Sequence, residues 1–175
     1  MADMLVNLLE LEDYQGIVNR LKEEGIEVFR ALAPDKLRIL DWVQGHSSRN
    51  AAGECDVCFS GKPISCFIAA RGSEIIGYAC YNATAPDFFG PTRVLQEYQG
   101  KGIGKALLLR SLHAMRDEGY QYAIIGGIGP AEFYEKCVGA VMIESSKRKN
   151  VYEHFLAGIE RREEEDNAAG QARKK

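Results

Sequence analysis

The sequence lacks a long apolar run, an excess of basic residues and a basic, hydrophobic start. A bilayer-spanning helix needs roughly 20 apolar residues in succession, and no segment approaches that length. The formal net charge is -3 and the pI is about 5.7, whereas a nucleic-acid-binding face is normally basic. The first residues, Met1–Leu5, are unlike a secretory signal. We therefore expect a soluble cytoplasmic protein with neither a nucleic-acid nor a membrane partner.

Cysteine is scarce and odd in number, with 5 among 175 residues, so the chain does not suggest a disulfide framework. Cys55 and Cys58 have the C-x-x-C spacing of a metal or redox motif. A zinc site needs a second pair of ligands, but only Cys66 follows closely, with no histidine near it in sequence. We expect reduced, half-buried thiols and no metal.

The length suits one domain with a proper core and is short for two. Residues 1–159 are expected to form this domain, and the charged segment 160–175 a disordered tail. The polar, glycine-containing segment 45–54 is expected to be a mobile loop. Apolar periodicity and Gly or Pro punctuation predict strands at 4–9, 63–70, 74–82, 88–95, 122–125, 141–144 and 151–156, and helices at 12–24, from 34 onward, at 102–118 and at 130–138.

The order of these elements predicts the fold class. The strands at 63–70 and 74–82 form an antiparallel hairpin, whereas the apolar run 122–125 directly follows a helix and suits a parallel βαβ unit. We expect an α/β (α+β) domain with one mixed, mostly antiparallel sheet of about 6–7 strands flanked by about 4 helices.

The most informative segment runs from Val94 to Ala106, where a strand leads through alternating glycines directly into a helix. The first N–H groups of a helix have no carbonyl partner and carry partial positive charge. Glycines let the backbone wrap closely around an anion, and two lysines add charge at the rim. The segment therefore predicts a phosphate or pyrophosphate site.

Two other glycine-rich loops fit less well. A P-loop requires Ser or Thr where Ala106 stands, and the dinucleotide fingerprint requires Gly in place of Lys105. A tight turn that binds nothing is the remaining alternative.

Gln99, Gly102 and Gly104 match the pattern Gln/Arg-x-x-Gly-x-Gly/Ala, and Phe133–Lys136 reads Phe-Tyr-Glu-Lys on a later helix. In both motifs the sequence resembles the GNAT superfamily of acyl-CoA N-acetyltransferases, over roughly residues 64–156. It departs from the usual pattern at Gln96, where Pro is common. The loop 126–129 is a second departure from the pattern. Its glycines are expected to leave this loop open beside the thioester of a bound acyl-CoA.

The resemblance implies acetyl-CoA as the cosubstrate. Its pantetheine arm would lie along Val94–Leu95 like an added strand, in a splay between the strands at 88–95 and 121–126. Its pyrophosphate would rest on the amides of residues 99–104. The residues thus expected at the cosubstrate are Val94, Leu95, Gln99, Gly100, Lys101, Gly102, Ile103, Gly104 and Lys105.

Tyr134 matches the family tyrosine that protonates the departing thiolate. A phenol with a pKa near 10 can supply that proton at neutral pH. The alternative is a core aromatic whose hydroxyl finds a hydrogen bond.

No general base is evident, because the region Phe88–Pro91, where many relatives carry a carboxylate, is apolar. Asp87 and Glu74 are the nearest acids, each expected to be a solvated turn residue, and a water relay is equally acceptable. His113 is expected on the surface.

These observations predict transfer of an acetyl group from acetyl-CoA to a primary amine of a small molecule, by direct attack in a ternary complex. The alternatives are a CoA-binding module without transferase activity, a protein N-acetyltransferase, and a non-enzymatic interaction domain. The oligomeric state stays open, with a homodimer as one option.

Overall fold

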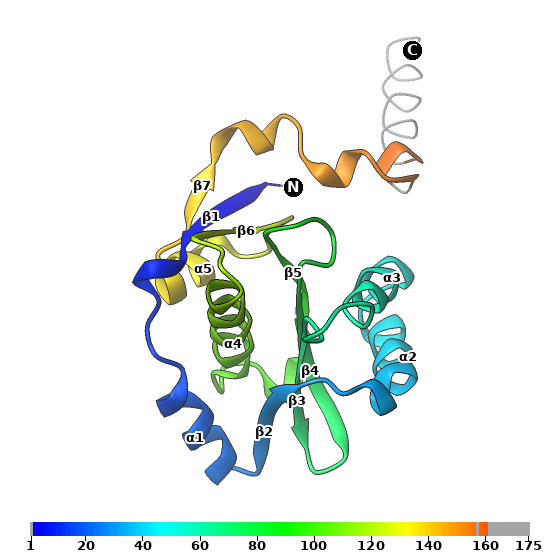
Figure 1. The fold of residues 1–175 in the computed structure, drawn as a ribbon, viewed down its shortest axis with the longest axis vertical. Helices are drawn as coiled ribbons and strands as arrows, with labels where there is room; N and C mark the ends of the chain where they lie inside the picture. Colours follow the sequence, from blue (N-terminus) through cyan, green and yellow to red (C-terminus); the bar gives the residue numbers. More distant parts are fainter. Residues whose placement is uncertain (1, 157, 161–175) are drawn as a thin grey trace, which may run out of the picture.

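The computed structural model describes residues 2–156 and 158–160 (Figure 1). Within them lie seven strands and five α-helices. The α/β class and the single mixed sheet are confirmed, with one helix more than expected. The tail 160–175 falls, except for its first residue, outside the described residues.

The helices and strands have the following bounds: β1 (Asp3–Asn7), α1 (Gln15–Glu23), β2 (Ile26–Arg30), α2 (Lys36–His46), α3 (Arg49–Val57), β3 (Cys66–Arg71), β4 (Glu74–Tyr81), β5 (Phe88–Val94), α4 (Ile103–Asp117), β6 (Tyr122–Ile125), α5 (Ala131–Val138) and β7 (Val141–Ile143).

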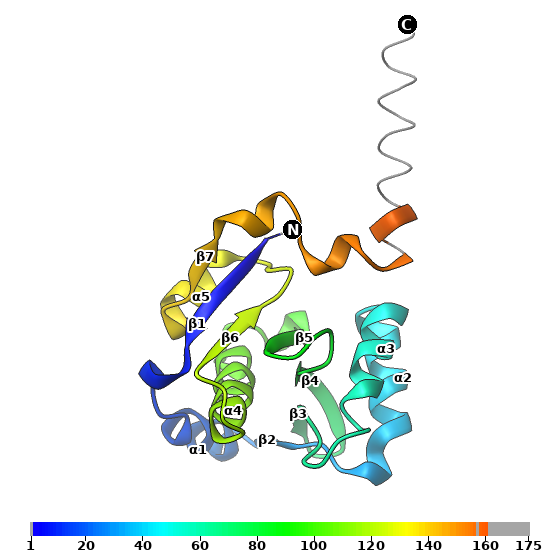
Figure 2. The same cartoon turned by 45° about the horizontal axis from the view of Figure 1, so that its top comes forward.

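The strands lie in the order β2-β3-β4-β5-β6-β1-β7. All neighbours are antiparallel except β5 and β6, which are parallel because α4 carries the chain back between them. This pairing confirms the expected βαβ unit. The N-terminal strand β1 lies inside the sheet, between β6 and β7 (Figure 2).

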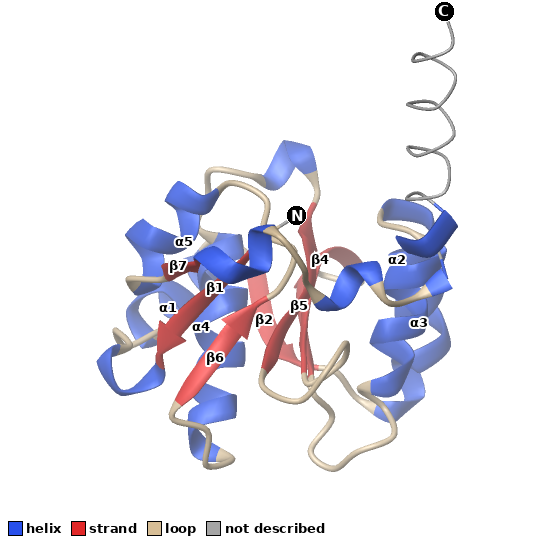
Figure 3. Ribbon diagram, turned by 90° about the horizontal axis from the view of Figure 1, so that it is seen from above, coloured by secondary structure: helices blue, strands red, loops and turns tan. Residues whose placement is uncertain are grey.

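Helices cover both faces of the sheet, with α2 and α3 on one face and α1, α4 and α5 on the other (Figure 3). The core is accordingly divided into two clusters. Tyr78 and Cys80 of β4 pack in the cluster under α2 and α3, whereas Ile76 and Tyr81 pack with α4. A strand that is buried on both faces is apolar throughout, which explains the continuous run in β4.

The prediction of a mobile loop at 45–54 was wrong, because most of this segment belongs to helices α2 and α3. The hydroxyl of Ser48 starts α3 by accepting a hydrogen bond from the N–H of Ala51 (3.0 Å). The helix buries only small side chains, namely Ala51, Ala52 and Cys55, so it carries little hydrophobic signal in the sequence.

Two further expectations are corrected. Instead of a strand at 151–156, the segment opens with a 3-10 turn at Val151–Glu153, because the side chain of Asn150 accepts a hydrogen bond from the N–H of Tyr152 (3.0 Å). His113 is buried rather than on the surface, and its Nε2 lies 2.7 Å from the carbonyl oxygen of Glu12.

Among the described residues, no helix combines the length and apolarity needed to cross a bilayer.

Candidate active site

β5 and β6 are paired over only two residues of each strand and then diverge. They pair only at Phe88 with Ile124 and at Phe89 with Ile125, whereas β5 stays paired with β4 as far as Val94. The expected splay is therefore present. It leaves one edge of β5 open over residues 90–94.

The backbone of Val94 faces this open edge. The next N–H, that of Leu95, donates to the carbonyl oxygen of Ile76 in β4 (2.9 Å). Neighbouring residues of a strand direct their amides to opposite edges, so the N–H of Val94 points into the splay. The carbonyl oxygen of Val94 accepts a hydrogen bond from Nε2 of Gln99 (3.2 Å). The edge thus offers a donor to an extended ligand.

The glycine loop connects this edge to α4. Gly100 and Gly102 have φ angles of 78° and 87°, which only glycine adopts at little cost. Gly102 caps α4 without a side chain, and the first helical hydrogen bond runs from the N–H of Ala106 to the carbonyl oxygen of Gly102 (3.0 Å). The N–H groups of residues 103–105 therefore remain available to an anion.

Basic side chains surround this loop. Nζ of Lys105 lies 2.8 Å from Oε2 of Glu12, and this hydrogen bond lowers the pKa of the Glu12 carboxyl. Nζ of Lys101 lies over the ring of Tyr98, 5.2 Å from its centroid. Arg20, which the sequence reasoning missed, donates from Nη2 to the carbonyl oxygen of Lys101 (3.0 Å). It comes from α1, too far along the sequence to be linked with the loop.

A groove of about 640 Å³ runs along the loop and the open edge of β5. Most of the residues expected at the cosubstrate line it. Leu95 instead packs against the core, and Lys101 lies outside the lining over Tyr98. The residues from the predicted set that line the groove are Val94, Gln99, Gly100, Gly102, Ile103, Gly104 and Lys105.

The glycines at 102 and 104 differ in what a side chain would meet. A Cβ at Gly102 would lie 2.8 Å from Nη2 of Arg20, in a backbone conformation that disfavours side chains. A Cβ at Gly104 would lie 3.6 Å from Cζ of Phe133, an ordinary contact, and would project into the groove. Gly104 can therefore be substituted with less strain on the fold.

Tyr134 lies on α5 at the end of the groove. Its side chain is buried and meets Phe133 edge to face, with ring centroids 5.1 Å apart. Burial, and after it the neighbouring Cys137, raises the pKa of the phenol. The hydroxyl consequently keeps its proton at neutral pH.

A second cavity of about 360 Å³ opens on the other side of Tyr134. It shares Phe89, Thr92, Pro130 and Tyr134 with the groove, so the two spaces adjoin at these residues. The other residues that line it are Glu54, Gly90, Pro91, Ile125, Gly126, Gly127, Gly129 and Tyr152.

Glu54 of α3 is an acidic residue in this second cavity. Its Oε1 accepts a hydrogen bond from Oγ1 of Thr84 (2.5 Å), which fixes the carboxylate. Sequence reasoning missed Glu54 because the surrounding segment was expected to be a loop. The Ser48 cap of α3 was the signal that could have revealed it.

The two acids named from the sequence lie elsewhere. Glu74 is exposed at the start of β4. Asp87 is not a freely solvated turn residue: burial raises its pKa, and its Oδ1 has no hydrogen-bond partner among the described residues. Neither residue lines the groove or the second cavity.

Tyr152 covers the loop that was expected to be open. A Cβ at Gly126 would lie 2.5 Å from the Tyr152 hydroxyl oxygen and 2.7 Å from Cδ1 of Phe88. A Cβ at Gly127 would lie 3.0 Å from the Tyr152 ring. The glycines here make room for an aromatic wall of the second cavity, and burial raises the pKa of Tyr152 to about 12.

Comparison with solved structures supports the same fold. The chain is similar to a GCN5-related glucosamine N-acetyltransferase region in a fungal multi-domain GH3 β-N-acetylglucosaminidase, with a TM-score of 0.64 and 13% identity over 81% of this chain and 19% of that one. It is also similar to GCN5-related N-acetyltransferases from Sphaerobacter thermophilus (TM-score 0.56, 17% identity, 81% of this chain and 47% of that one) and Kribbella flavida (0.54, 12%, 81% and 53%). At such identities the likeness concerns the fold, and this chain spans 19% to 53% of those proteins' lengths.

No curated protein matches the sequence. Residues 27–140, more than half of the chain, match the family model described as the acetyltransferase (GNAT) family. The match includes the splay, the glycine loop and Tyr134. The chain belongs to the GNAT family of acetyltransferases.

Proposed function

We propose that the protein transfers an acetyl group from acetyl-CoA to a primary amine of a small molecule, by direct attack in a ternary complex. The observation that carries this proposal is the meeting of two cavities at Tyr134. One of them offers helix amides and an open strand edge, and the other offers a carboxylate.

The groove suits acetyl-CoA. The free N–H groups of residues 103–105 and the nearby lysines suit its pyrophosphate. The open edge of β5 over residues 90–94 suits the amide-containing pantetheine arm, which would extend the sheet there. With the arm in this position, the thioester would come to the junction with the second cavity.

The second cavity suits a small amine. Its volume of about 360 Å³ is near the lower end of the range for ligand pockets. The carboxylate of Glu54 would accept a hydrogen bond from the N–H of a neutral amine, while the rings of Phe89 and Tyr152 would pack against the apolar part of the acceptor.

Three groups of the chain would share the chemistry. As the amine nitrogen bonds to the carbonyl carbon, the N–H of Val94 stabilises the charge that builds on the carbonyl oxygen. Glu54 receives the proton that the nitrogen releases, directly or through water. When the carbon–sulfur bond breaks, Tyr134 gives its proton to the sulfur, and solvent restores both groups.

A thiol-release assay tests this proposal. Acetyl-CoA is incubated with the protein and, in turn, with amino acids, amino sugars, polyamines, aminoglycosides and peptides that have a free N-terminus. We expect at least one small primary amine to accelerate release of CoA and to gain one acetyl group by mass spectrometry. Release with peptides alone would make the protein a protein N-acetyltransferase, and binding without release would make it a CoA-binding module. Either result contradicts the proposal.

The variant Gly104→Val tests the groove separately. The added side chain fills the space beside the helix amides, and loss of hydrogen bonds to a charged group costs about 1.5–3 kcal/mol. We therefore expect acetyl-CoA to bind at least about tenfold more weakly in titration calorimetry. Gly45→Val is the matched control, because Gly45 lies in α2 with open space around its Cα. Equal affinity in the Gly104 variant and the wild type would show that the loop does not hold the pyrophosphate.

A further inference from the structure

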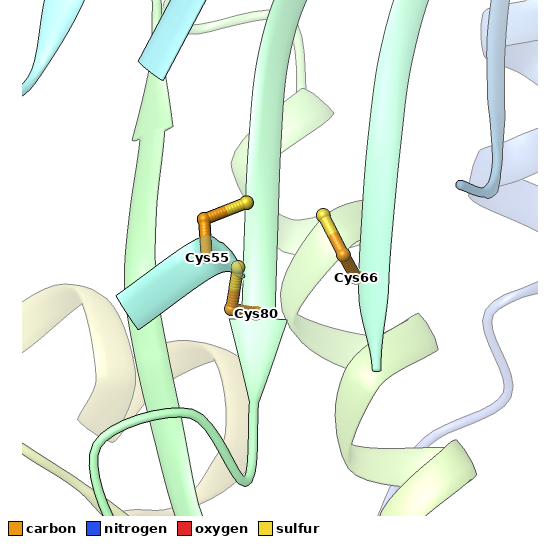
Figure 4. A group of neighbouring side chains, drawn as sticks. All are labelled: Cys55, Cys66 and Cys80. Carbon is orange, nitrogen blue, oxygen red and sulfur yellow. The ribbon is translucent and has the colours of Figure 1, made fainter. Parts of the chain in front are cut away.

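Three thiols converge beneath α3 (Figure 4), and none of them lines the groove. Cys55 comes from the last turn of this helix, and Cys66 and Cys80 stand opposite each other in the β3–β4 ladder. Their Sγ atoms all lie within 4.8 Å of one another. Each of the three residues is fully buried.

Cys58 adds a fourth thiol to this group. It caps the end of α3 and is 1% exposed. Its Sγ lies 4.0 Å from the carbonyl oxygens of Glu54 and Tyr81, the chain neighbours of Cys55 and Cys80, so Cys58 stands at the edge of the group and outside the set of three sulfurs that all lie within 4.8 Å of one another. Four of the chain's five cysteines thus gather in one place, and Cys137 lies apart from them, beside the groove.

The spacing of the sulfur atoms fits a shared metal ion. A disulfide holds its sulfurs at about 2.05 Å. Thiolates bound to zinc at about 2.3 Å are separated by roughly 3.8 Å in a tetrahedral site. The sulfurs of Cys55, Cys66 and Cys80, which lie within 4.8 Å of one another, reach that separation through side-chain rotations, and Cys58 joins them by rotating away from the carbonyl oxygens of Glu54 and Tyr81. Thiolates are, in addition, the donors that zinc sites prefer.

We propose that Cys55, Cys58, Cys66 and Cys80 bind one zinc ion as a closed structural site. The ion replaces the four thiol protons, which leave to solvent, and no oxidation or reduction takes place. It ties the end of α3 to the β3–β4 hairpin. The sequence-based expectation of no metal depended on a missing fourth ligand, and the hairpin supplies that ligand by placing Cys80 opposite Cys66.

The first test uses the full chain, purified under reducing conditions without a metal-affinity tag. We expect about one zinc ion per chain by plasma mass spectrometry. Cobalt added to the metal-free protein should give thiolate-to-cobalt charge-transfer absorption together with the intense visible bands of a tetrahedral site. Zinc should raise the midpoint of thermal unfolding by about 5 °C or more relative to chelator-treated protein.

Variants then assign the ligands. Cys55→Ser and Cys80→Ser should lose the cobalt spectrum, and Cys137→Ser, the matched control, should keep it. Because a buried serine can itself destabilise the fold, Cys66→Val serves as an apolar replacement that should also lose the spectrum while the protein stays folded by circular dichroism. The proposal is overturned if the wild type binds neither ion at micromolar concentration, if zinc and chelator give the same unfolding midpoint, or if Cys55→Ser still holds one ion per chain. A disulfide among these thiols in the freshly purified protein would overturn it as well.

Discussion

Replacing Tyr134 with phenylalanine is expected to lower kcat about 10²-fold, the contribution of a single general acid. KM for acetyl-CoA should stay near its wild-type value, because the lost interaction exists mainly in the transition state. The change removes one oxygen and keeps the ring against Phe133, so packing is preserved. Steady-state kinetics with an acceptor found in the thiol-release assay measures the effect.

The pH profile separates an acid from a packing residue. The phenol works only in its protonated form, so the wild-type rate falls when the pH rises above the pKa of Tyr134. Since burial, followed by Cys137, raises this pKa above the ordinary value of 10.0, that fall should occur at high alkaline pH. The Tyr134→Phe variant should lack it. Tyr122→Phe is the control, because Tyr122 is 49% exposed on β6 and lines neither cavity. An unchanged kcat in Tyr134→Phe would mean that water or another group, and not Tyr134, protonates the departing thiolate.

Replacing Glu54 with glutamine is expected to lower kcat/KM for the amine by about 10²-fold or more, within the range of general acid–base catalysis. The amide keeps the size of the carboxylate and can still accept a hydrogen bond from Thr84, but it has neither charge nor basicity. The affinity for acetyl-CoA should not change, because Glu54 does not line the groove. Kinetics at varied acceptor concentration, with acetyl-CoA held saturating, gives the ratio.

Asp56→Asn is the matched control for Glu54. Asp56 is on the same helix and also loses one negative charge, but it pairs with Lys36 at the surface (2.7 Å). An exposed pair of this kind contributes little to stability. If both variants slowed the reaction equally, the loss of a negative charge from α3, and not the loss of the carboxylate in the cavity, would explain the effect.

The elements around the groove could be predicted because their signals are local. The glycines of the loop, the apolar face of α4 and the continuous apolar runs of the hairpin each identify an element within a short window of sequence. The splay followed from the family resemblance. The loop amides were identified from neighbouring residues, whereas the role of Tyr134 followed from the family resemblance of its Phe-Tyr-Glu-Lys motif.

The acceptor side could not be predicted in this way, because it is assembled from distant segments. Glu54, Thr84 and Tyr152 come from three parts of the chain and meet only in the folded protein. The four cysteines show the same limitation, since Cys80 joins the C-x-x-C pair only through the pairing of β3 with β4. Strand β2 was also not predicted from the sequence, but here the signal was local: buried and exposed residues alternate in Ile26–Arg30, which directly follows Gly25.

The close approach of Tyr152 to the glycine loop also constrains how the protein can evolve. Any side chain at position 126 would collide with both Tyr152 and Phe88, so such a substitution requires these aromatic side chains to shift or to be exchanged. Position 126 and position 152 should therefore vary together among relatives. A descendant that exchanged both would lose one wall of the cavity beside Tyr134 while keeping the groove, because neither position lines the groove. Acceptor preference could diverge along this line of descent without any change in how acetyl-CoA is held.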